Sequence, residues 1–364
     1  MTMKFKSYTE IENTYRTDVI QMIRDLGYDK PEVPWVAEVK WDGSNLQCCI
    51  DADDNFIVGK RSSYIGNDMN FQGLPNALAH QDLENKIRQI KNIIYERMKH
   101  TVVEIFDHKF AIRVYGELAG GRYKHPDVEP VKNAKIIQGR VQYHPDDVFL
   151  PFDIEVLDAE DKILYVFTQL SVIDICKQVG LPYPIIVAKG TFDDMLKVPV
   201  EFNDETGHIL FGLPVLENNM GEGVVIKPNV PLLDKYGHRI MLKNKVAKFS
   251  EKSKKAPKEK EAIRDYNELE IKYLELMREY ITESRFMSVI SKVGEVNEKA
   301  FGMVLGMFLK DINNDFNKEH GDEIAKIEAE MDKDQFNFAR IRKDVSTEGR
   351  NFILPLFMNK IHNN

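Results

Sequence analysis

Short apolar runs separated by turn residues fill the first 250 residues of the chain. Many of these runs are short and rich in β-branched and aromatic residues, a pattern typical of β-strands. The runs lie at residues 33–41, 45–50, 55–61, 110–120, 146–158, 162–167, 223–228 and 238–244. Two helical segments interrupt them, at 82–99 and 172–179. Because long crossovers are few, the pattern predicts an α+β domain of antiparallel sheets flanked by helices.

The pattern changes after residue 250. Residues 251–262 are dominated by charged side chains and predict a linker, whereas apolar residues beyond it recur at helical spacing. Helices are expected within 263–281, 286–294, 298–312, 322–331 and 351–361, separated by Gly294, Gly302 and the polar residues near 312–322. We therefore predict a larger α+β domain at 1–250 and a small all-helical domain at 263–364.

Composition restricts the class of protein. The chain has 364 residues, a net charge of -8 and 43% hydrophobic residues, as expected for a globular protein of two or three domains. No stretch is apolar enough for a membrane span, and residues 1–15 lack the core of a secretion signal. We expect a cytoplasmic protein, in the host cytoplasm if it is viral. The three cysteines suggest no disulfide framework and the histidines no zinc site.

Lys40 is an unusual residue at the end of the apolar run 33–41. Asp42 and Gly43 follow it, so an amine, a carboxylate and a tight turn are adjacent. A lysine with a free pKa of about 10.4 becomes a nucleophile only when burial or neighbouring cations favour its neutral form. The ordinary alternative is a lysine whose charged end reaches solvent at the end of a strand.

Other side chains suited to chemistry follow at the ends of predicted strands. They are Arg61, Glu117, Phe152, Glu222, Lys227, Lys243 and Lys245. Strand alternation predicts that Phe152 and Asp153 point to opposite faces and that Lys243 and Lys245 share one face. Each has an ordinary explanation by itself: a solvated charge, or a core aromatic for Phe152. Their joint order along the chain is more informative.

In that order the residues resemble the motifs of the covalent nucleotidyltransferase superfamily of ATP-dependent ligases and capping enzymes. The resemblance implies that Lys40 is the lysine that becomes adenylylated. It implies that Phe152 stacks on the base and Glu117 binds the ribose. Glu222 would help to hold Mg²⁺ or Mn²⁺. The remaining nucleotide-binding residues would be Val39, Asn45, Arg61, Lys227, Lys243 and Lys245, the last two also contacting phosphate during catalysis.

A second group of motifs is similar to the C-terminal domain of the phage-type RNA ligase 2 family. These are RFMSVISKV at 285–293, GEVNEKAFG at 294–302 and GMFLKDI at 306–312. The resemblance implies that Arg285 and Asp311 serve the RNA-joining steps, whereas an ion pair between them on a helix surface is the ordinary alternative.

The family resemblance implies an ATP-dependent RNA ligase. It would seal 3′-OH/5′-phosphate breaks in nicked double-stranded RNA or RNA/DNA hybrids through a lysyl-AMP intermediate and an adenylylated RNA 5′ end. No membrane and no obligate protein partner are expected, and we predict a monomer.

Three positions depart from the family pattern. Many relatives have glutamate at the position of Val39, histidine at Asp42 and threonine at Ser44. Asp42 is common in DNA ligases and capping enzymes, so an ATP-dependent DNA-strand ligase and a GTP-dependent capping guanylyltransferase stay open as alternatives. Both normally carry an OB-fold where this chain predicts helices. A non-catalytic clamp that binds nicks is a third alternative.

Overall fold

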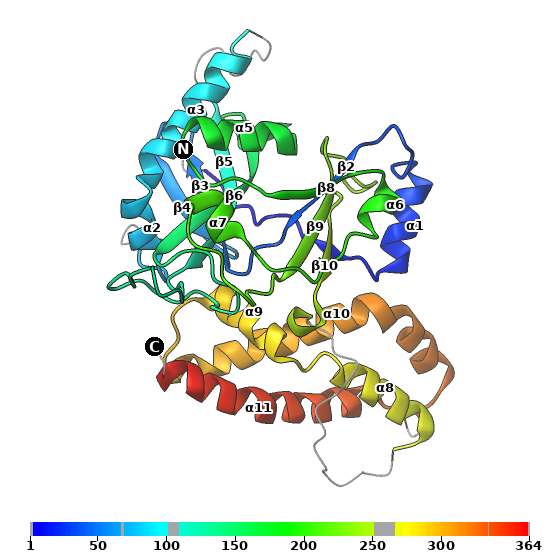
Figure 1. The fold of residues 1–364 in the computed structure, drawn as a ribbon. Helices are drawn as coiled ribbons and strands as arrows, with labels where there is room; N and C mark the ends of the chain where they lie inside the picture. Colours follow the sequence, from blue (N-terminus) through cyan, green and yellow to red (C-terminus); the bar gives the residue numbers. More distant parts are fainter. Residues whose placement is uncertain (1–2, 67–68, 101–108, 251–265, 334, 363–364) are drawn as a thin grey trace. The chain divides into compact units, whose positions relative to one another are not determined.

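The computed structural model describes residues 3–66, 69–100, 109–250, 266–333 and 335–362 (Figure 1). The chain divides into two compact units, Met1–Val246 and Ala247–Asn364. The predicted linker at 251–262 and the predicted start of the helical domain at 263 lie outside the described residues.

Two five-stranded sheets form the first unit. Sheet A has the order β1-β10-β9-β2-β8, comprising β1 (Glu12–Asn13), β10 (Leu242–Lys245), β9 (Gly223–Pro228), β2 (Trp35–Val39) and β8 (Ile186–Gly190). Sheet B has the order β4-β3-β5-β6-β7, comprising β4 (Phe56–Lys60), β3 (Ser44–Ile50), β5 (Ala111–Gly120), β6 (Asp147–Leu157) and β7 (Ile163–Val166). Among the strands that the structure describes, β1 and β10 pair in parallel and all other pairings are antiparallel. The predicted α+β class is confirmed.

Helices α2 (Leu74–His80), α3 (Leu83–Met98) and α5 (Gln169–Gln178) pack on sheet B. The buried side chains of α3 include Ile87, Ile90 and Ile94, which recur at helical spacing and fill the core against β3 and β5. The two helices predicted from the sequence correspond to α3 and α5. The prediction that only two helices interrupt the strands was wrong.

Within the described residues, the sequence pattern missed α1 (Thr17–Asp25), α2, α6 (Phe192–Met195) and α7 (Thr206–Phe211). They have four to nine residues, so few apolar positions repeat and the pattern is weak. Helices α1 and α6 supply Ile23, Phe192 and Met195 to a second core, which covers one face of sheet A around Trp35.

The opposite face of sheet A carries polar side chains toward sheet B. Trp35 and Ala37 belong to the apolar core of sheet A, so the alternation of β2 turns Glu38 to the other face. On that face Lys227 of β9 lies 2.8 Å from Glu38 and 3.4 Å from the Phe152 carbonyl of β6. The two sheets therefore approach each other across charged residues.

Four long helices dominate the second unit: α8 (Glu268–Arg278), α9 (Glu283–Val293), α10 (Phe301–Glu330) and α11 (Phe338–His362). The all-helical prediction is confirmed, and α9 ends before Gly294 as expected. The predicted breaks at Gly302 and at 312–322 were wrong, because both positions lie inside α10. Apolar side chains spaced four apart continue through the polar stretch and stay buried, namely Val304, Phe308, Ile312 and Phe316.

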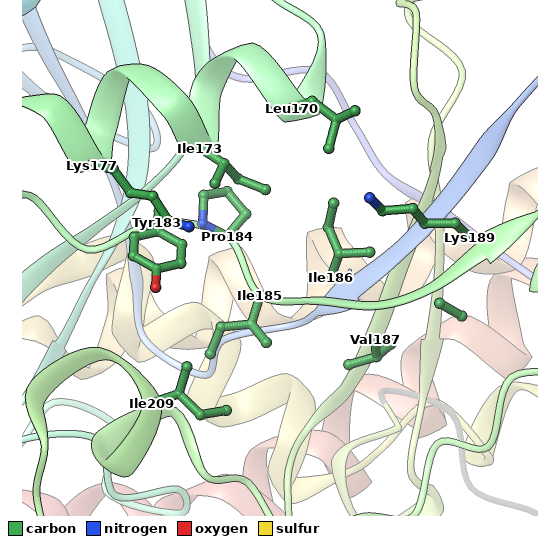
Figure 2. Close-up of a pocket in the computed structure, with 11 residues that line it drawn as sticks. Leu170, Ile173, Lys177, Tyr183, Pro184, Ile185, Ile186, Val187, Lys189 and Ile209 are labelled. Carbon is green, nitrogen blue, oxygen red and sulfur yellow. The ribbon is translucent and has the colours of Figure 1, made fainter.

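An apolar recess of about 590 Å³ lies between α5 and β8, lined by residues that include Ile173, Tyr183 and Ile186 (Figure 2). None of the residues predicted to carry chemistry lines it. Within the described part of the chain, no helix has both the length and the apolar character to cross a membrane.

Candidate active site

Glu222 lies between two lysines. Its Oε2 is 2.7 Å from Lys40 Nζ and its Oε1 is 3.0 Å from Lys245 Nζ. Lys40 directly follows β2, and its backbone N–H donates to the Gly223 carbonyl at 2.9 Å. The Glu222 side chain is only 4% exposed, whereas that of Lys40 is 19% exposed. The structure thus brings together three residues predicted to share the site.

Close packing of β9 and β10 makes this arrangement possible. Gly223 pairs with Lys245 in the sheet register and has a φ of +144°. A Cβ at residue 223 would lie 2.1 Å from the Asn244 carbonyl oxygen, so a larger residue would separate the strands. Glycine therefore keeps Glu222 within reach of Lys245.

The two lysines determine the charge of Glu222. Burial by itself would raise the pKa of this carboxyl, but the ammonium groups of Lys40 and Lys245 outweigh burial and hold the pKa below its usual value. Glu222 is therefore ionised in this state and pairs with the Lys40 amine. The sequence-based expectation of a lysine activated by surrounding cations omitted this carboxylate partner.

Glu117 reaches the same site from β5. It pairs with Asn45 of β3 in the sheet register, and both side chains are partly exposed. A Cβ on Gly43 would lie 2.4 Å from the Leu118 carbonyl oxygen, so glycine lets the turn after Lys40 pack directly against β5.

The charges of the site act together on Glu117. Burial raises its pKa to about 8, with Lys40 and Arg61 opposing the rise and Glu222 and Asp42 adding to it. Arg61 follows β4, is partly exposed and acts on Glu117 through its charge. Lys243 is partly exposed on β10, the strand that also carries Lys245.

Phe152 occupies a β-bulge. Tyr115 pairs with Asp153 and Gly116 with Pro151, so Phe152 is the extra residue of β6. The predicted opposite orientation of Phe152 and Asp153 was wrong, because a bulge interrupts alternation and redirects side chains. Both residues contact Tyr8, whose hydroxyl donates to Asp153 Oδ2 at 2.7 Å and whose ring centroid lies 5.0 Å from that of Phe152.

Lys227 and Glu38 form a buried ion pair beside this bulge. Lys227 lies within β9, one residue before its end. Sequence reasoning missed Glu38, although its position two residues before Lys40 places it on the same face of the strand. The backbone N–H of Val39 donates a hydrogen bond to the Ile185 carbonyl at 2.9 Å.

Sequence reasoning also missed the residues that hold the turn after Lys40. Arg140 makes a bidentate ion pair with Asp42, and the Trp41 indole donates to Thr206 Oγ1 at 3.2 Å. These contacts join segments more than 95 residues apart. No local sequence pattern marks them.

Arg285 and Asp311 do not pair with each other. Arg285 is 1% exposed, its guanidinium is 2.9 Å from Asp315 Oδ2 and its Nε donates to the Tyr280 carbonyl at 3.1 Å. Asp311 makes an ion pair with Lys292. The alternative of a mutual surface pair was therefore wrong, and Arg285 belongs to the interior of the helical unit.

Among the described residues, no group of three or more His, Cys, Asp and Glu side chains is placed to hold a metal ion.

Comparisons with known proteins identify the family of the chain. The profile of the RNA ligase family matches residues 33–245, and a profile described as T4 RNA ligase 2 C-terminal matches residues 264–335. RNA-editing ligase 2, mitochondrial, of Trypanosoma brucei brucei is 24% identical over 91% of this chain and 87% of its own length.

Solved structures of Naegleria gruberi RNA ligases are also similar. The apo form of a mutant of RNA ligase R4a has a TM-score of 0.42 and 16% identity, covering 67% of this chain and 57% of that chain. A mutant bound to AMP and Mn gives the same TM-score, identity and coverage.

An α+β domain of two five-stranded sheets, together with the matching family profiles, identifies an RNA ligase of the nucleotidyltransferase superfamily. The chain belongs to the RNA ligase family. The predicted class, an ATP-dependent RNA ligase, is confirmed by the family profiles and the trypanosome relative. RNA is accordingly its class of substrate.

Proposed function

We propose that this RNA ligase uses Lys40 as the nucleophile that takes AMP from ATP, and that it seals 3′-OH/5′-phosphate nicks in duplex RNA or RNA/DNA hybrids. The contact between Lys40 and Glu222, with Lys245 on the other carboxylate oxygen, supports this assignment most directly. It gathers an amine, a carboxylate and a second cation at one point, as transfer of a charged phosphoryl group requires.

Phe152 and Glu117 would position the nucleotide. Phe152 is partly exposed at a bulge that directs it away from regular strand alternation, which suits an aromatic ring that stacks on adenine. Glu117 would bind a ribose hydroxyl, next to Asn45 on the neighbouring strand. Val39, Arg61, Lys227 and Lys243 would complete the nucleotide-binding set.

Glu222 fits a divalent cation. Mg²⁺ and Mn²⁺ bind one or two carboxylates together with substrate phosphates and water, so a single buried carboxylate close to phosphate-binding lysines is a suitable ligand. Once bound, the cation would neutralise charge on the phosphate oxygens. Side chains of the protein would supply the nucleophile and the remaining phosphate contacts.

In the first reaction Lys40 leaves Glu222 and gives up a proton to water. Its neutral amine attacks the α-phosphorus of ATP, an N–P bond forms, the nitrogen loses a second proton to water, the bond to the bridging oxygen breaks and pyrophosphate leaves. Lys243 and Lys245 hold phosphate oxygens as charge develops. The AMP then passes to an RNA 5′-phosphate oxygen, which releases the Lys40 amine.

In the last reaction the RNA 3′-hydroxyl attacks the activated 5′-phosphate, forms the phosphodiester and releases AMP. A duplex aligns the two ends of a nick, so positioning is largely supplied by the substrate. Arg285 and Asp311 of the helical unit would serve these RNA-joining steps. The proposed working form is a monomer, and the cytoplasm stays the predicted compartment, although the trypanosome relative is named as mitochondrial.

Label transfer from α-labelled ATP tests the nucleophile. Lys40→Ala should abolish covalent labelling of the protein, and Lys40→Arg should do the same while keeping a cation beside Glu222. Labelling that survives both substitutions would refute the assignment of Lys40.

A panel of matched nicks tests the substrate. Duplexes with RNA, DNA or mixed strands at the nick are incubated with enzyme, ATP and Mg²⁺. We expect sealing of nicked RNA and of RNA-containing hybrids. Preferential sealing of all-DNA nicks would favour the DNA-ligase alternative, and nick binding without AMP release would favour the non-catalytic clamp.

A further inference from the structure

We propose that Arg140 is a positioning residue for the adenylylation of Lys40, acting through Asp42. The inference rests on the proposed function of Lys40. Arg140 lies in the segment between β5 and β6, about 100 residues from Lys40 in sequence, and no pattern in the sequence connects the two.

The contact between Arg140 and Asp42 has the geometry of a strong ion pair. Arg140 Nε is 3.0 Å from Asp42 Oδ2 and its terminal nitrogen is 2.5 Å from Oδ1, so both carboxylate oxygens are bound. The Asp42 side chain is 3% exposed. A bidentate pair of this kind fixes orientation as well as charge, and losing one partner leaves a buried charge uncompensated.

A second residue of the same segment holds the backbone of the turn. The Asp42 N–H donates to the Tyr143 hydroxyl at 2.7 Å, and Tyr143 is fully buried. Arg140 therefore binds the side chain of Asp42, and Tyr143 binds its main chain, two positions after Lys40. Lys40 is held by β2 on one side and by these contacts to Asp42 on the other, so together they restrict where the Lys40 amine can lie.

The ion pair also offsets negative charge around Lys40. The groups that act on Asp42 are Arg140 of the segment between β5 and β6, Glu222 before β9 and Lys40 of its own turn. Asp42 in turn acts on Glu117 of β5. Burial raises the pKa of Asp42, and Arg140 opposes the rise by stabilising the carboxylate. Without Arg140 this carboxyl would take up a proton at a higher pH.

The test measures the rate of self-adenylylation as a function of pH and of ATP concentration. Arg140→Met should slow label transfer on the order of 10- to 100-fold, the range expected for a misplaced reacting group. The apparent affinity for ATP should change much less than the rate. The acid limb of the pH profile should move to higher pH, because the unpaired Asp42 carboxyl protonates sooner.

Two further variants separate positioning from general destabilisation. Asp42→Asn combined with Arg140→Met removes the titrating group, so the acid limb should return to its wild-type position. Arg140→Lys keeps the charge but not the bidentate contact, so it should keep the wild-type pH profile at a reduced rate. Arg97→Met, which removes a surface pair with Asp174, serves as a matched control and should label at the wild-type rate.

The outcomes are distinct. A wild-type pH profile in Arg140→Met, or a rate loss matched by an equal loss in Arg97→Met, would overturn the role of Arg140 and leave Lys40 in place. If Arg140→Met fails to fold, the profile of Arg140→Lys and the rate of Asp42→Asn decide instead, since a positioning role requires both variants to be slowed. Wild-type protein that takes up no label would refute the proposed function itself.

Discussion

Lys40 Nζ lies 2.7 Å from Glu222 Oε2, although the two residues are 182 positions apart in the sequence. Antiparallel pairing of β2 with β9 places the end of one strand beside the start of the other, and this pairing brings the two side chains together. The contact has two consequences. It places the Lys40 amine against a buried carboxylate, and the two lysines that contact Glu222 together hold the pKa of this carboxyl below its usual value.

Lys243 and Lys245 should each be needed for label transfer. Replacement of either by alanine removes a cation placed for phosphate oxygens and should slow self-adenylylation on the order of 100-fold or more. Lys245→Ala should have the larger effect, because it also leaves one oxygen of buried Glu222 without its lysine. Lys189→Ala, on the exposed strand β8, is the control and should label normally. Equal rates in all three variants would contradict the phosphate-binding role.

Glu117 should make the free energy of unfolding depend on pH. Its pKa is about 8 in the folded protein against a usual value of 4.5, so between these values the folded state retains a proton that the unfolded state has lost. The contribution of Glu117 to stability is therefore present below pH 4.5 and is lost as pH rises toward 8.

Urea unfolding at pH 5 and pH 8 measures this effect in wild-type protein and in Glu117→Gln. The glutamine variant should gain free energy of unfolding relative to wild type at pH 8, and the difference should shrink at pH 5. An unchanged difference at the two pH values would show that Glu117 titrates normally.

Phe152 should act on nucleotide binding more than on the chemical step. Phe152→Ala removes the stacking surface and should weaken ATP binding by roughly 10-fold, in keeping with about 1–3 kcal/mol for base–aromatic stacking. Phe152→Tyr keeps the ring and should bind nearly as wild type does. Titration of ATP in label-transfer assays checks both. A large loss in Phe152→Tyr would indicate a packing role against Tyr8 instead.

Arg285 and Asp311 should matter for RNA joining and not for self-adenylylation. Arg285→Ala and Asp311→Ala should label with AMP at the wild-type rate and seal pre-adenylylated RNA nicks on the order of 10-fold or more slowly, as expected when aligning groups are lost. Loss of both activities together would refute this division of work between the two units.

The observed ion pairs supply the controls for that experiment. Asp315→Ala removes the partner of Arg285, and Lys292→Ala removes the partner of Asp311. Because Arg285 is buried, Arg285→Ala should also lower the melting temperature of the protein. If Asp315→Ala lowers the melting temperature equally but keeps sealing intact, the sealing defect of Arg285→Ala belongs to Arg285 itself.

The sequence alone determined the elements with strong periodic patterns. The apolar runs that became β3, β5 and β6 were predicted, and so was the long helix α3, because burial on one face forces a regular repeat of apolar residues. Lys40, Glu222 and Lys245 were predicted as a group because they follow the motif order of one family. Each of these features can be recognised from the residues of a short segment of the sequence.

Tertiary structure decided what depends on contacts between distant segments. The reversal of Phe152 at a bulge, the pairing of Glu38 with Lys227 and the grip of Arg140 on Asp42 all need strand registers that local sequence does not encode. The partners of Arg285 and Asp311 were also fixed only by helix packing. A side chain's neighbours across a sheet or between helices are set by the lowest free energy of the whole fold, so a motif names the reacting residue while the fold selects the residues that hold it.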